Sequence, residues 1–359
     1  MSRGTVLMMA GGTGGHVFPA LAVAGELAQS GFAVQWLGSR RGIENSLVPE
    51  AGYPLHALEV RGLRGGGLAR TLMAPLMLLR AVLSAVVLVR RLRPVLAVGF
   101  GGYASGPGGL AARLNGVPLV LHEQNARSGL TNRLLARVAT RVLQAFPGAF
   151  ADAEVVGNPV RAGIFSLAPP AERLISHQGP LRLLVLGGSQ GALALNRDLP
   201  PALADYLGTS RKDAVVIRHQ CGRDRQEEVR QAYEKTGLSV SIEEFIRAMD
   251  DAYQWADLVI CRAGALTVSE VAAAGVAAVF VPLPTAVDDH QTLNARWLAD
   301  QQAGRLLPQS SLNRDGLAGV LDELMNREAL AGMAARARSM ARPDSAARVA
   351  AICEEVLHG

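Results

Sequence analysis

The chain has 359 residues, of which 49% are hydrophobic and 19% charged, which predicts a globular protein of about two domains and excludes a disordered one. The formal net charge is +5, and most basic residues are arginines, which suit phosphate and anionic surfaces. Nucleic acid is not an expected partner, because aromatic residues make up only 4% and no helix-turn-helix, RNP or zinc-finger pattern occurs.

The cysteines lie far apart and form no CxxC pair, so neither a disulfide framework nor a metal cluster is indicated. They are Cys221, Cys261 and Cys353. This usage fits a reducing compartment. No signal peptide is expected, because glycines interrupt the N-terminal apolar run at residue 11.

Strands and helices alternate through the first half of the chain. Strands are predicted at residues 5–9, 33–37, 54–60, 95–99, 118–121 and 141–143. Helices are predicted at about 17–30, 43–50, 71–92 and 131–139, with one more after the glycine-rich loop 99–108. This alternation predicts a parallel sheet covered on both faces, with ligands at the carboxyl ends of its strands.

The pattern restarts after residues 168–180, which we interpret as a connection between domains. Further strands are predicted at residues 182–186, 215–219, 239–242, 258–261 and 278–281, and a final amphipathic helix at 345–357. The segment LLVLGGSQGA in this half parallels LMMAGGTGGH in the first. The fold class expected is therefore α/β, with two facing Rossmann-like domains and a deep cleft between them.

The segment GGTGGHVFPA, at residues 11–20, joins the first strand to the first helix. Four glycines in five positions remove the Cβ atoms that would keep an anion from the backbone, and the helix directs free amides and its positive dipole end at the loop. The alternative is a tight turn without a ligand. The dinucleotide fingerprint fails because Val17 stands at the third glycine position, and no Walker A loop or DxD pair occurs. Backbone amides are thus expected to bind phosphate without a metal.

The segment CRAGALTVSE, at residues 261–270, also joins a strand to a helix. The amides of residues 265–267 can hold a diphosphate, and Glu270 can accept hydrogen bonds from two ribose hydroxyls. The alternative is a capping box with Thr267 as N-cap and Glu270 as its partner. The run DDHQ, at residues 288–291, either contacts sugar hydroxyls or caps the next helix.

Together, GGTGGHVFPA, GFGGYASGPGG, HEQN, GNPVR, GGSQGA, CRAGALTVSE and DDHQTLNA closely resemble the MurG family of bacterial N-acetylglucosaminyltransferases, over nearly the whole chain. The resemblance implies the glycosyltransferase B fold. It also implies inverting transfer of GlcNAc from UDP-GlcNAc to the C4 hydroxyl of the MurNAc of lipid I, which forms lipid II without a required cofactor or metal. We expect an acceptor domain at residues 1–165, joined by a C-terminal helix at about 343–359, and a donor domain at 166–342.

Alternatives remain open at this point. Another glycosyltransferase of the same fold would act on a different glycolipid or a natural product. An NADP-binding or redox domain is suggested by Arg40 and Arg41 after the second strand. A non-enzymatic membrane scaffold is the most remote alternative.

The resemblance implies which residues bind the substrates. Those expected to bind UDP-GlcNAc are Thr13, Gly14, Gly15, Asn125, Arg161, Ser189, Ile246, Ala265, Leu266, Thr267, Val268, Ser269, Glu270, His290 and Gln291. Those expected at the acceptor diphosphate are Gly12, Gly14, Gly15, Gly101, Gly102 and Tyr103.

His16 resembles the family's candidate general base. Inversion needs one displacement in which a base removes the acceptor proton, and the dipole at a helix N-terminus favours a neutral imidazole. The alternative is that His16 only hydrogen-bonds the acceptor or the loop. Glu123 is the second candidate, and its alternative is a buried carboxylate that holds the HEQN loop.

The lipid tail of the acceptor implies a peripheral protein at the cytoplasmic face of the bacterial inner membrane. The resemblance also implies roles in cell-wall biogenesis, cell shape and cell division, with cell-wall synthesis and division proteins as further partners. Residues 72–89 are apolar, but Pro75 and the central Arg80 favour a helix of a folded domain over a membrane span. The membrane patch expected on this helix comprises Leu72, Leu76, Leu79, Arg80 and Leu83. The alternative is an ordinary crossover helix.

The loop RGLRGGG, at residues 61–67, departs from the family. Many relatives have a lysine where Gly66 stands, and Arg64 or Arg70 is expected to substitute for it.

Overall fold

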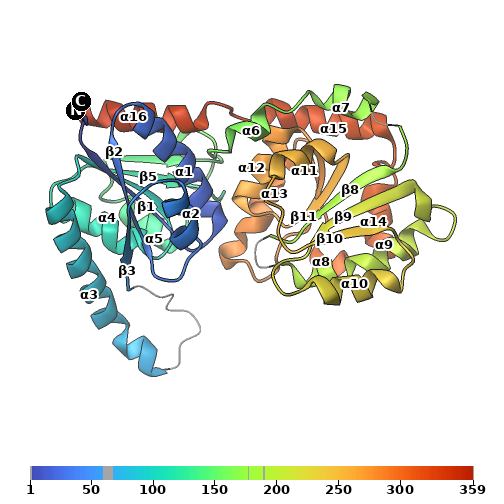
Figure 1. The fold of residues 1–359 in the computed structure, drawn as a ribbon, viewed down its shortest axis with the longest axis horizontal. Helices are drawn as coiled ribbons and strands as arrows, with labels where there is room; N and C mark the ends of the chain where they lie inside the picture. The colour runs from blue at the N-terminus through green and yellow to red at the C-terminus, as the bar shows by residue number, and fades with distance from the viewer. Residues whose placement is uncertain (1, 60–67, 177, 189–190, 359) are drawn as a thin grey trace. The chain divides into compact units, whose positions relative to one another are not determined.

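The computed structural model describes residues 2–59, 68–176, 178–188 and 191–358, and for 68–72 and 175–176 only the backbone. The chain forms two compact units (Figure 1). The first comprises Met1–Arg161 and Arg342–Gly359, and the second comprises Ala162–Ala341. The division thus falls at Arg161 rather than at residue 165, and the C-terminal helix belongs to the first unit. Each unit is described by itself.

The first unit contains a parallel sheet of order β3-β2-β1-β4-β5-β6-β7. Its strands are β1 (Thr5–Ala10), β2 (Ala33–Ser39), β3 (Leu55–Leu58), β4 (Leu96–Gly101), β5 (Leu119–Glu123), β6 (Arg141–Gln144) and β7 (Glu154–Val155). The central strands are buried along almost their whole length, as expected for a parallel sheet with both faces covered. Strand β7 was not predicted from the sequence, because two residues carry no periodic pattern.

Helices cover both faces of this sheet. They are α1 (Gly14–Gln29), α2 (Glu44–Glu50), α3 (Leu68–Leu92), α4 (Ser105–Leu114), α5 (Leu130–Leu135) and α16 (Ser345–His358). One hydrophobic cluster packs α1, α2 and α16 on one face, and a second packs α3, α4 and α5 on the other. The two ends of the chain lie side by side (Figure 1), and Arg3 pairs with Glu354 at 2.8 Å.

The second unit contains a parallel sheet of order β10-β9-β8-β11-β12-β13. Its strands are β8 (Leu181–Leu186), β9 (Val215–Gln220), β10 (Val240–Glu243), β11 (Leu258–Cys261), β12 (Ala277–Phe280) and β13 (Arg305–Leu306). Its α-helices are α6 (Ala162–Phe165), α7 (Pro170–Ser176), α8 (Leu193–Arg197), α9 (Leu199–Leu207), α10 (Gln226–Glu234), α11 (Met249–Trp255), α12 (Ala265–Ala274), α13 (His290–Ala299), α14 (Arg314–Leu321) and α15 (Arg327–Met340).

Short 3-10 helices of this unit are η1 (Lys212–Ala214), η2 (Val287–Asp289) and η3 (Gln309–Ser311). The connection expected at 168–180 is partly wrong, because residues 170–176 form helix α7. Its Arg173 donates hydrogen bonds to the carbonyls of Tyr253 and Ala274, which fixes α7 to the second unit.

The strand order of each sheet reverses next to its central strand. In the first sheet, the chain continues from β1 to β2 on one side and from β4 to β5 on the other. In the second sheet, it continues from β8 to β9 on one side and from β11 to β12 on the other. Ligands of doubly wound folds bind at such switch points. In the first unit, the loops after β1 and β4 meet there. In the second unit, the loops after β8 and β11 follow neighbouring strands at the same edge of the sheet.

Candidate functional site

The N-terminal glycine loop leads directly into α1. The helix begins at Gly14 rather than near residue 17, so His16 lies within its first turn. Among the described residues, the amides of Gly14 and Gly15 have no hydrogen-bond partner, because the first turn of a helix leaves its amides free. Thr13 is the N-cap, but its side chain makes no capping bond. Gly14 and Gly15 therefore offer open donors to an anion.

A buried carboxylate that the sequence analysis missed supports this loop. Glu44 accepts a hydrogen bond from the amide of Gly12 at 2.9 Å, and from the amide and hydroxyl of Ser39 at 2.9 and 2.7 Å. A Cβ atom on Gly11 would overlap the Glu44 carboxylate. Gly11 is therefore needed to make room for the Glu44 carboxylate. The Gly12 amide, predicted to bind the acceptor diphosphate, is already used within the domain.

The loop after β4 packs against the first loop. Gly101 and Gly102 have φ values of +96° and +86°, where glycine is favoured. A Cβ atom on Gly102 would overlap the carbonyl oxygen of Gly11, so these two loops approach backbone to backbone. Tyr103, which follows, is 58% exposed. The predicted acceptor residues from the two loops therefore lie together.

His16 is half-buried at this junction. Its Nδ1 lies 2.9 Å from Oε1 of Gln124. A Cβ atom on Gly101 would lie 3.1 Å from the imidazole ring, so the glycine lets β4 pass close to it. Nε2 has no hydrogen-bond partner among the residues that the structure describes. This nitrogen is available for a substrate hydroxyl.

Glu123 is buried at the end of β5 and holds the loop that follows. One oxygen accepts from the amide and the side chain of Asn125 at 3.0 and 3.2 Å. The other accepts from the amide of Gly129 at 3.3 Å and from Asn132 at 2.9 Å. With both oxygens engaged, the structural alternative is favoured over a role of Glu123 as base.

Two further residues predicted to bind the donor lie in the first unit. The side-chain nitrogen of Asn125 is directed at Glu123. The Arg161 guanidinium lies 4.9 Å from the ring centroid of Phe18 on α1, which is a cation–π distance. This contact places Arg161 beside the helix that follows the glycine loop.

In the second unit, α12 begins directly after β11. Its N-cap is Gly264, so Thr267 is the third helical residue and the capping-box alternative is wrong. Within the described part of the chain, the amides of Ala265, Leu266 and Thr267 have no partner, and the first helical bond runs from Val268 to Gly264. This helix end can therefore bind an anion with three amides.

Glu270 lies one turn further along α12. It is buried and accepts a hydrogen bond from the hydroxyl of Tyr253 at 3.2 Å. Two residues lie between the three free amides of this helix end and Glu270. Val268 is buried, and its amide donates to the Gly264 carbonyl. Ser269 donates its hydroxyl to the Ala265 carbonyl at 2.9 Å. The structure therefore leaves Val268 and Ser269 little to offer a ligand. The buried Ile246 follows β10, and its amide has no partner among the described residues.

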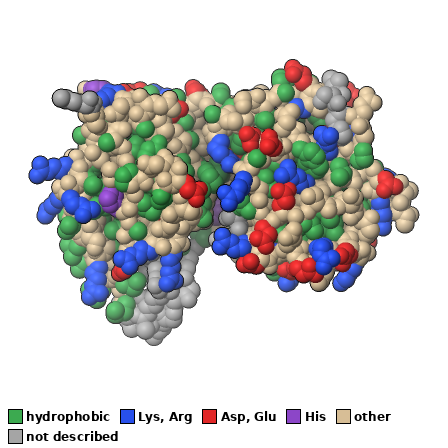
Figure 2. All heavy atoms as spheres, in the orientation of Figure 1, with side chains coloured by type: hydrophobic (Ala, Val, Ile, Leu, Met, Phe, Trp, Pro, Cys, Tyr) green, Lys and Arg blue, Asp and Glu red, His purple; other side chains and the backbone are tan. Residues whose placement is uncertain are grey.

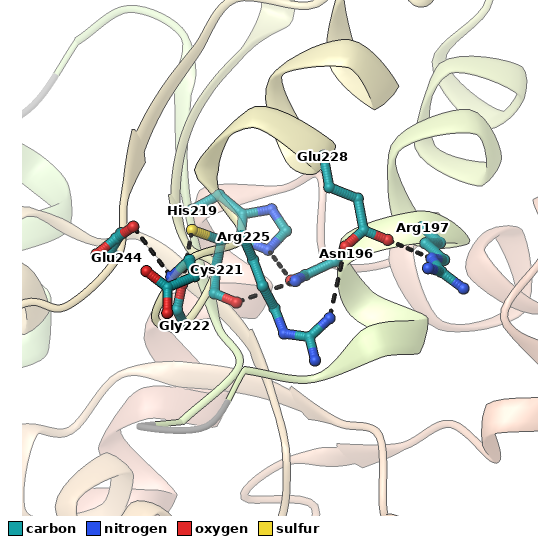
Figure 3. Close-up of polar contacts among 9 residues, drawn as sticks. Asn196, Arg197, His219, Cys221, Gly222, Arg225, Glu228 and Glu244 are labelled. Atoms are coloured by element: carbon teal, nitrogen blue, oxygen red, sulfur yellow. Dashed lines mark hydrogen bonds and ion pairs between the residues drawn. The ribbon is translucent and has the colours of Figure 1, made fainter.

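The glycine loop after β8 is held from β9. Gln220 accepts from the Gly188 amide and donates to the Gly188 carbonyl, both at 3.0 Å. A Cβ atom on Gly191 would overlap the carbonyl oxygen of Cys221, which accepts from Asn196 at 2.9 Å. Figure 3 shows Asn196 between this carbonyl and His219. Ser189, predicted at the diphosphate, lies outside the described residues.

A buried hydrogen-bond chain fixes Asn196. His219 lies 3.2 Å from the Asn196 side-chain oxygen and 3.0 Å from the Tyr233 hydroxyl. Burial lowers the pKa of His219 to about 3, so the ring is neutral. These hydrogen bonds therefore position the loop after β8 and are not suited to proton transfer at neutral pH.

His290 and Gln291 begin α13, after two aspartates with positive φ. Nδ1 of His290 lies 2.7 Å from the Val287 carbonyl, and Oε1 of Gln291 accepts from the Leu283 amide at 2.9 Å. Thr292 donates its hydroxyl to Asp289 at 2.6 Å. The predicted sugar-binding residues thus also brace their own loop.

Helix α3 combines a packed face with an exposed apolar face. Ala81, Ala85 and Val89 are buried in the first unit, which fits a helix of the folded domain. On the outer face, the exposed apolar side chains of the described residues are Met73, Leu76, Leu78, Leu79, Leu83 and Val87. Figure 2 shows apolar and basic side chains intermingled where Figure 1 draws α3. By length and composition alone, Met73–Leu92 could span a membrane, with 17% of its apolar stretch buried.

The loop with Arg64 and Gly66 lies outside the described residues, as do the side chains of Arg70 and Leu72. Arg80, at the centre of the helix, is exposed.

Two parallel sheets, each with a glycine loop and a helix N-terminus at its switch point, define the class as a two-domain α/β protein that binds an anionic ligand. Residues 6–144 match the glycosyltransferase family 28 N-terminal domain, and residues 182–349 match the family's C-terminal domain. The chain belongs to glycosyltransferase family 28. This result confirms the predicted fold and sets aside the NADP-binding and scaffold alternatives.

Three relatives match this chain over almost the full length of both proteins. A protein of Alcanivorax borkumensis named UDP-N-acetylglucosamine--N-acetylmuramyl-(pentapeptide) pyrophosphoryl-undecaprenol N-acetylglucosamine transferase is 60% identical, over 99% of both chains. A protein of the same name from Aeromonas hydrophila is 53% identical, over 99% of this chain and 98% of its own. The crystal structure of MurG from Acinetobacter baumannii is 46% identical, with a TM-score of 0.84 over 98% of this chain and 100% of that one. These matches confirm the resemblance to the MurG family.

More distant structures share only the fold. The calicheamicin glycosyltransferase CalG4 is 17% identical, with a TM-score of 0.69 over 100% of this chain and 99% of that one.

Proposed function

We propose that this chain transfers N-acetylglucosamine from UDP-GlcNAc to the C4 hydroxyl of the MurNAc of lipid I and forms lipid II, with inversion at the anomeric carbon. The observation that carries this assignment is the 60% identity, over 99% of both chains, to a transferase whose name states donor and acceptor. The local structure agrees with it, because both units present helix N-termini with open amides after glycine-containing loops.

The first unit supplies the base. His16 takes the proton of the C4 hydroxyl as that oxygen attacks the anomeric carbon, and the bond to UDP breaks with its electron pair leaving on the diphosphate. The Gly14 and Gly15 amides, with the loop of Gly101 to Tyr103 beside them, bind the diphosphate of the acceptor. Gly12 contributes only loop shape, because its amide is held by Glu44.

The second unit binds the donor. The amides of residues 265–267 face the diphosphate of UDP-GlcNAc and stabilise the charge that develops as UDP leaves. Glu270 accepts hydrogen bonds from the ribose hydroxyls, with Tyr253 holding one of its oxygens. Ile246 meets the uracil through its backbone, and Gln291 with His290 contacts the GlcNAc hydroxyls.

The reaction needs no metal ion. Helix-end amides supply the stabilisation that a divalent cation gives in other nucleotide-sugar enzymes. We expect the transfer rate in EDTA to equal the rate in Mg²⁺. A rate that falls in EDTA and returns with Mg²⁺ would contradict this part of the proposal.

The protein works at the cytoplasmic face of the bacterial inner membrane, where the acceptor's lipid is anchored. Support comes from the exposed apolar face of α3, with Arg80, Arg90 and Arg91 exposed on the same helix. Apolar side chains bordered by cations are typical of surfaces that bind anionic lipid.

A coupled assay tests the proposed function. UDP release is followed with UDP-GlcNAc and a soluble lipid I analogue, together and singly, and then with UDP-glucose or UDP-GalNAc in place of UDP-GlcNAc. We expect rapid release only with UDP-GlcNAc and the analogue together. Folded protein that releases no UDP with this pair, or that prefers another acceptor class, would overturn the assignment.

A further inference from the structure

A buried chain of side chains connects His16 to the backbone of the first unit. Oε1 of Gln124 lies 2.9 Å from Nδ1 of His16, and Nε2 of Gln124 lies 3.1 Å from Nδ1 of His122. Nε2 of His122 lies 2.9 Å from the carbonyl oxygen of Gly157. His122 and Gln124 are almost completely buried, so the hydrogen bonds between the half-buried His16 and Gly157 are shielded from solvent.

Backbone carbonyls fix the direction of every bond in this chain. Nε2 of Gln124 also lies 3.0 Å from the carbonyl oxygen of His122, which can only accept. The amide group of Gln124 therefore donates at that end, and its oxygen faces His16. Since this oxygen can only accept, Nδ1 of His16 must carry a proton.

The second histidine prevents Gln124 from turning over. Nε2 of His122 must donate to the Gly157 carbonyl, so in the neutral ring Nδ1 is an acceptor for the second amide hydrogen of Gln124. Burial lowers the pKa of His122 to about 4, which keeps the ring neutral. The ring also stacks on Phe100, with centroids 5.1 Å apart.

We infer that Gln124 and His122 are positioning residues that hold the neutral form of His16 in the tautomer with Nδ1 protonated and the lone pair on Nε2. This inference rests on the proposed role of His16 as base. In the reaction, Nε2 takes the acceptor proton while Nδ1 keeps its own and continues to donate to Gln124. A neutral amide cannot take that proton, so the charge stays on His16 until the proton is released to solvent.

The tautomer can be measured without any substrate. In protein labelled with ¹⁵N in its histidine rings, two-bond proton–nitrogen correlation spectra distinguish a protonated from an unprotonated ring nitrogen, and His16→Gln identifies the signals of His16. We expect Nδ1 of His16 to be protonated and Nε2 unprotonated. The opposite tautomer, or an equal mixture, in the wild type would overturn the inference even if the protein transfers GlcNAc.

Kinetics test the consequence for catalysis. Gln124→Leu removes the acceptor for the Nδ1 proton, and we expect kcat to fall between about 10-fold and 10⁴-fold, the larger value being the loss when a catalytic histidine adopts the wrong tautomer. KM for UDP-GlcNAc should stay close to the wild-type value. A folded Gln124→Leu protein with wild-type kcat would overturn the inference.

Two further variants separate positioning from stability. Gln144 is another buried glutamine of this unit, with hydrogen bonds to the carbonyls of Phe150 and Ala153, so Gln144→Leu is expected to destabilise the unit without lowering kcat. In Gln124→Glu, the oxygen that faces the His122 carbonyl must carry a proton in order to donate there, so the buried carboxyl group stays neutral and its other oxygen still accepts from His16. This variant should lose less kcat than Gln124→Leu. Equal losses in the two Gln124 variants would contradict a role through the Nδ1 proton. A wild type that fails to transfer GlcNAc but has the expected tautomer would refute the proposed function and not the geometry.

Discussion

Replacement of Leu76 and Leu79 by glutamate tests the membrane surface on α3. These side chains are 44% and 54% exposed. Full burial of a leucine is worth about 1.5–3 kcal/mol, so the two half-exposed side chains can contribute roughly 1.5–3 kcal/mol together on entering a membrane. Two added carboxylates near an anionic surface cost about 2 kcal/mol more, at about 1 kcal/mol each. The sum of about 3.5–5 kcal/mol lowers the partition coefficient roughly 300- to 5,000-fold.

The assay is co-sedimentation with liposomes that contain anionic lipid, with circular dichroism to confirm that the variant is folded. The matched control replaces Leu193 and Leu283 by glutamate, because these leucines of the second unit are 43% and 37% exposed and the charge change is the same. We expect the control to bind liposomes like the wild type. Unchanged binding of the α3 variant, or loss of its fold, would show that these leucines do not form a membrane-binding surface.

Three more predictions concern individual carboxylates and the base. His16→Ala should lower kcat roughly 10²–10⁴-fold, the usual loss of a general base, with little change in UDP-GlcNAc affinity by calorimetry; an unchanged kcat would exclude His16. Glu270→Ala should weaken UDP-GlcNAc binding by roughly 10- to 150-fold, since a hydrogen bond to a charged group is worth about 1.5–3 kcal/mol; wild-type affinity would contradict the ribose contact. Glu123→Ala should lower the free energy of unfolding by about 2–5 kcal/mol in urea titrations, because buried donors lose their acceptor; wild-type stability with a large loss of kcat would instead favour Glu123 as base.

Most of the fold could be predicted from the sequence, because its strands are long apolar runs and its helices lie between them. The exceptions have local causes. β7 and β13 have two residues each, too few for a periodic pattern. Helix α1 extends back over Gly14 and Gly15, which sequence reasoning assigned to the loop because glycine is a poor helix former.

The candidate site was only partly predictable. Residues that follow a strand and begin a helix, such as Gly14 and Ala265, could be found because strand, loop and helix are contiguous in the sequence. The groups that support them could not. Glu44 reaches the Gly12 amide across 32 positions, and Gln124 reaches His16 across 108. No spacing rule connects such pairs, because strand order in the sheet brings them together.

The structure of the product tests the proposed transfer directly. The protein is incubated with UDP-GlcNAc and a lipid I analogue, and the purified product is analysed by NMR for the position and configuration of the new linkage. We expect GlcNAc attached in the β configuration to the C4 oxygen of MurNAc, since one displacement inverts the α bond of the donor. An α linkage, attachment at another hydroxyl, or free GlcNAc as the main product would contradict the proposed transfer.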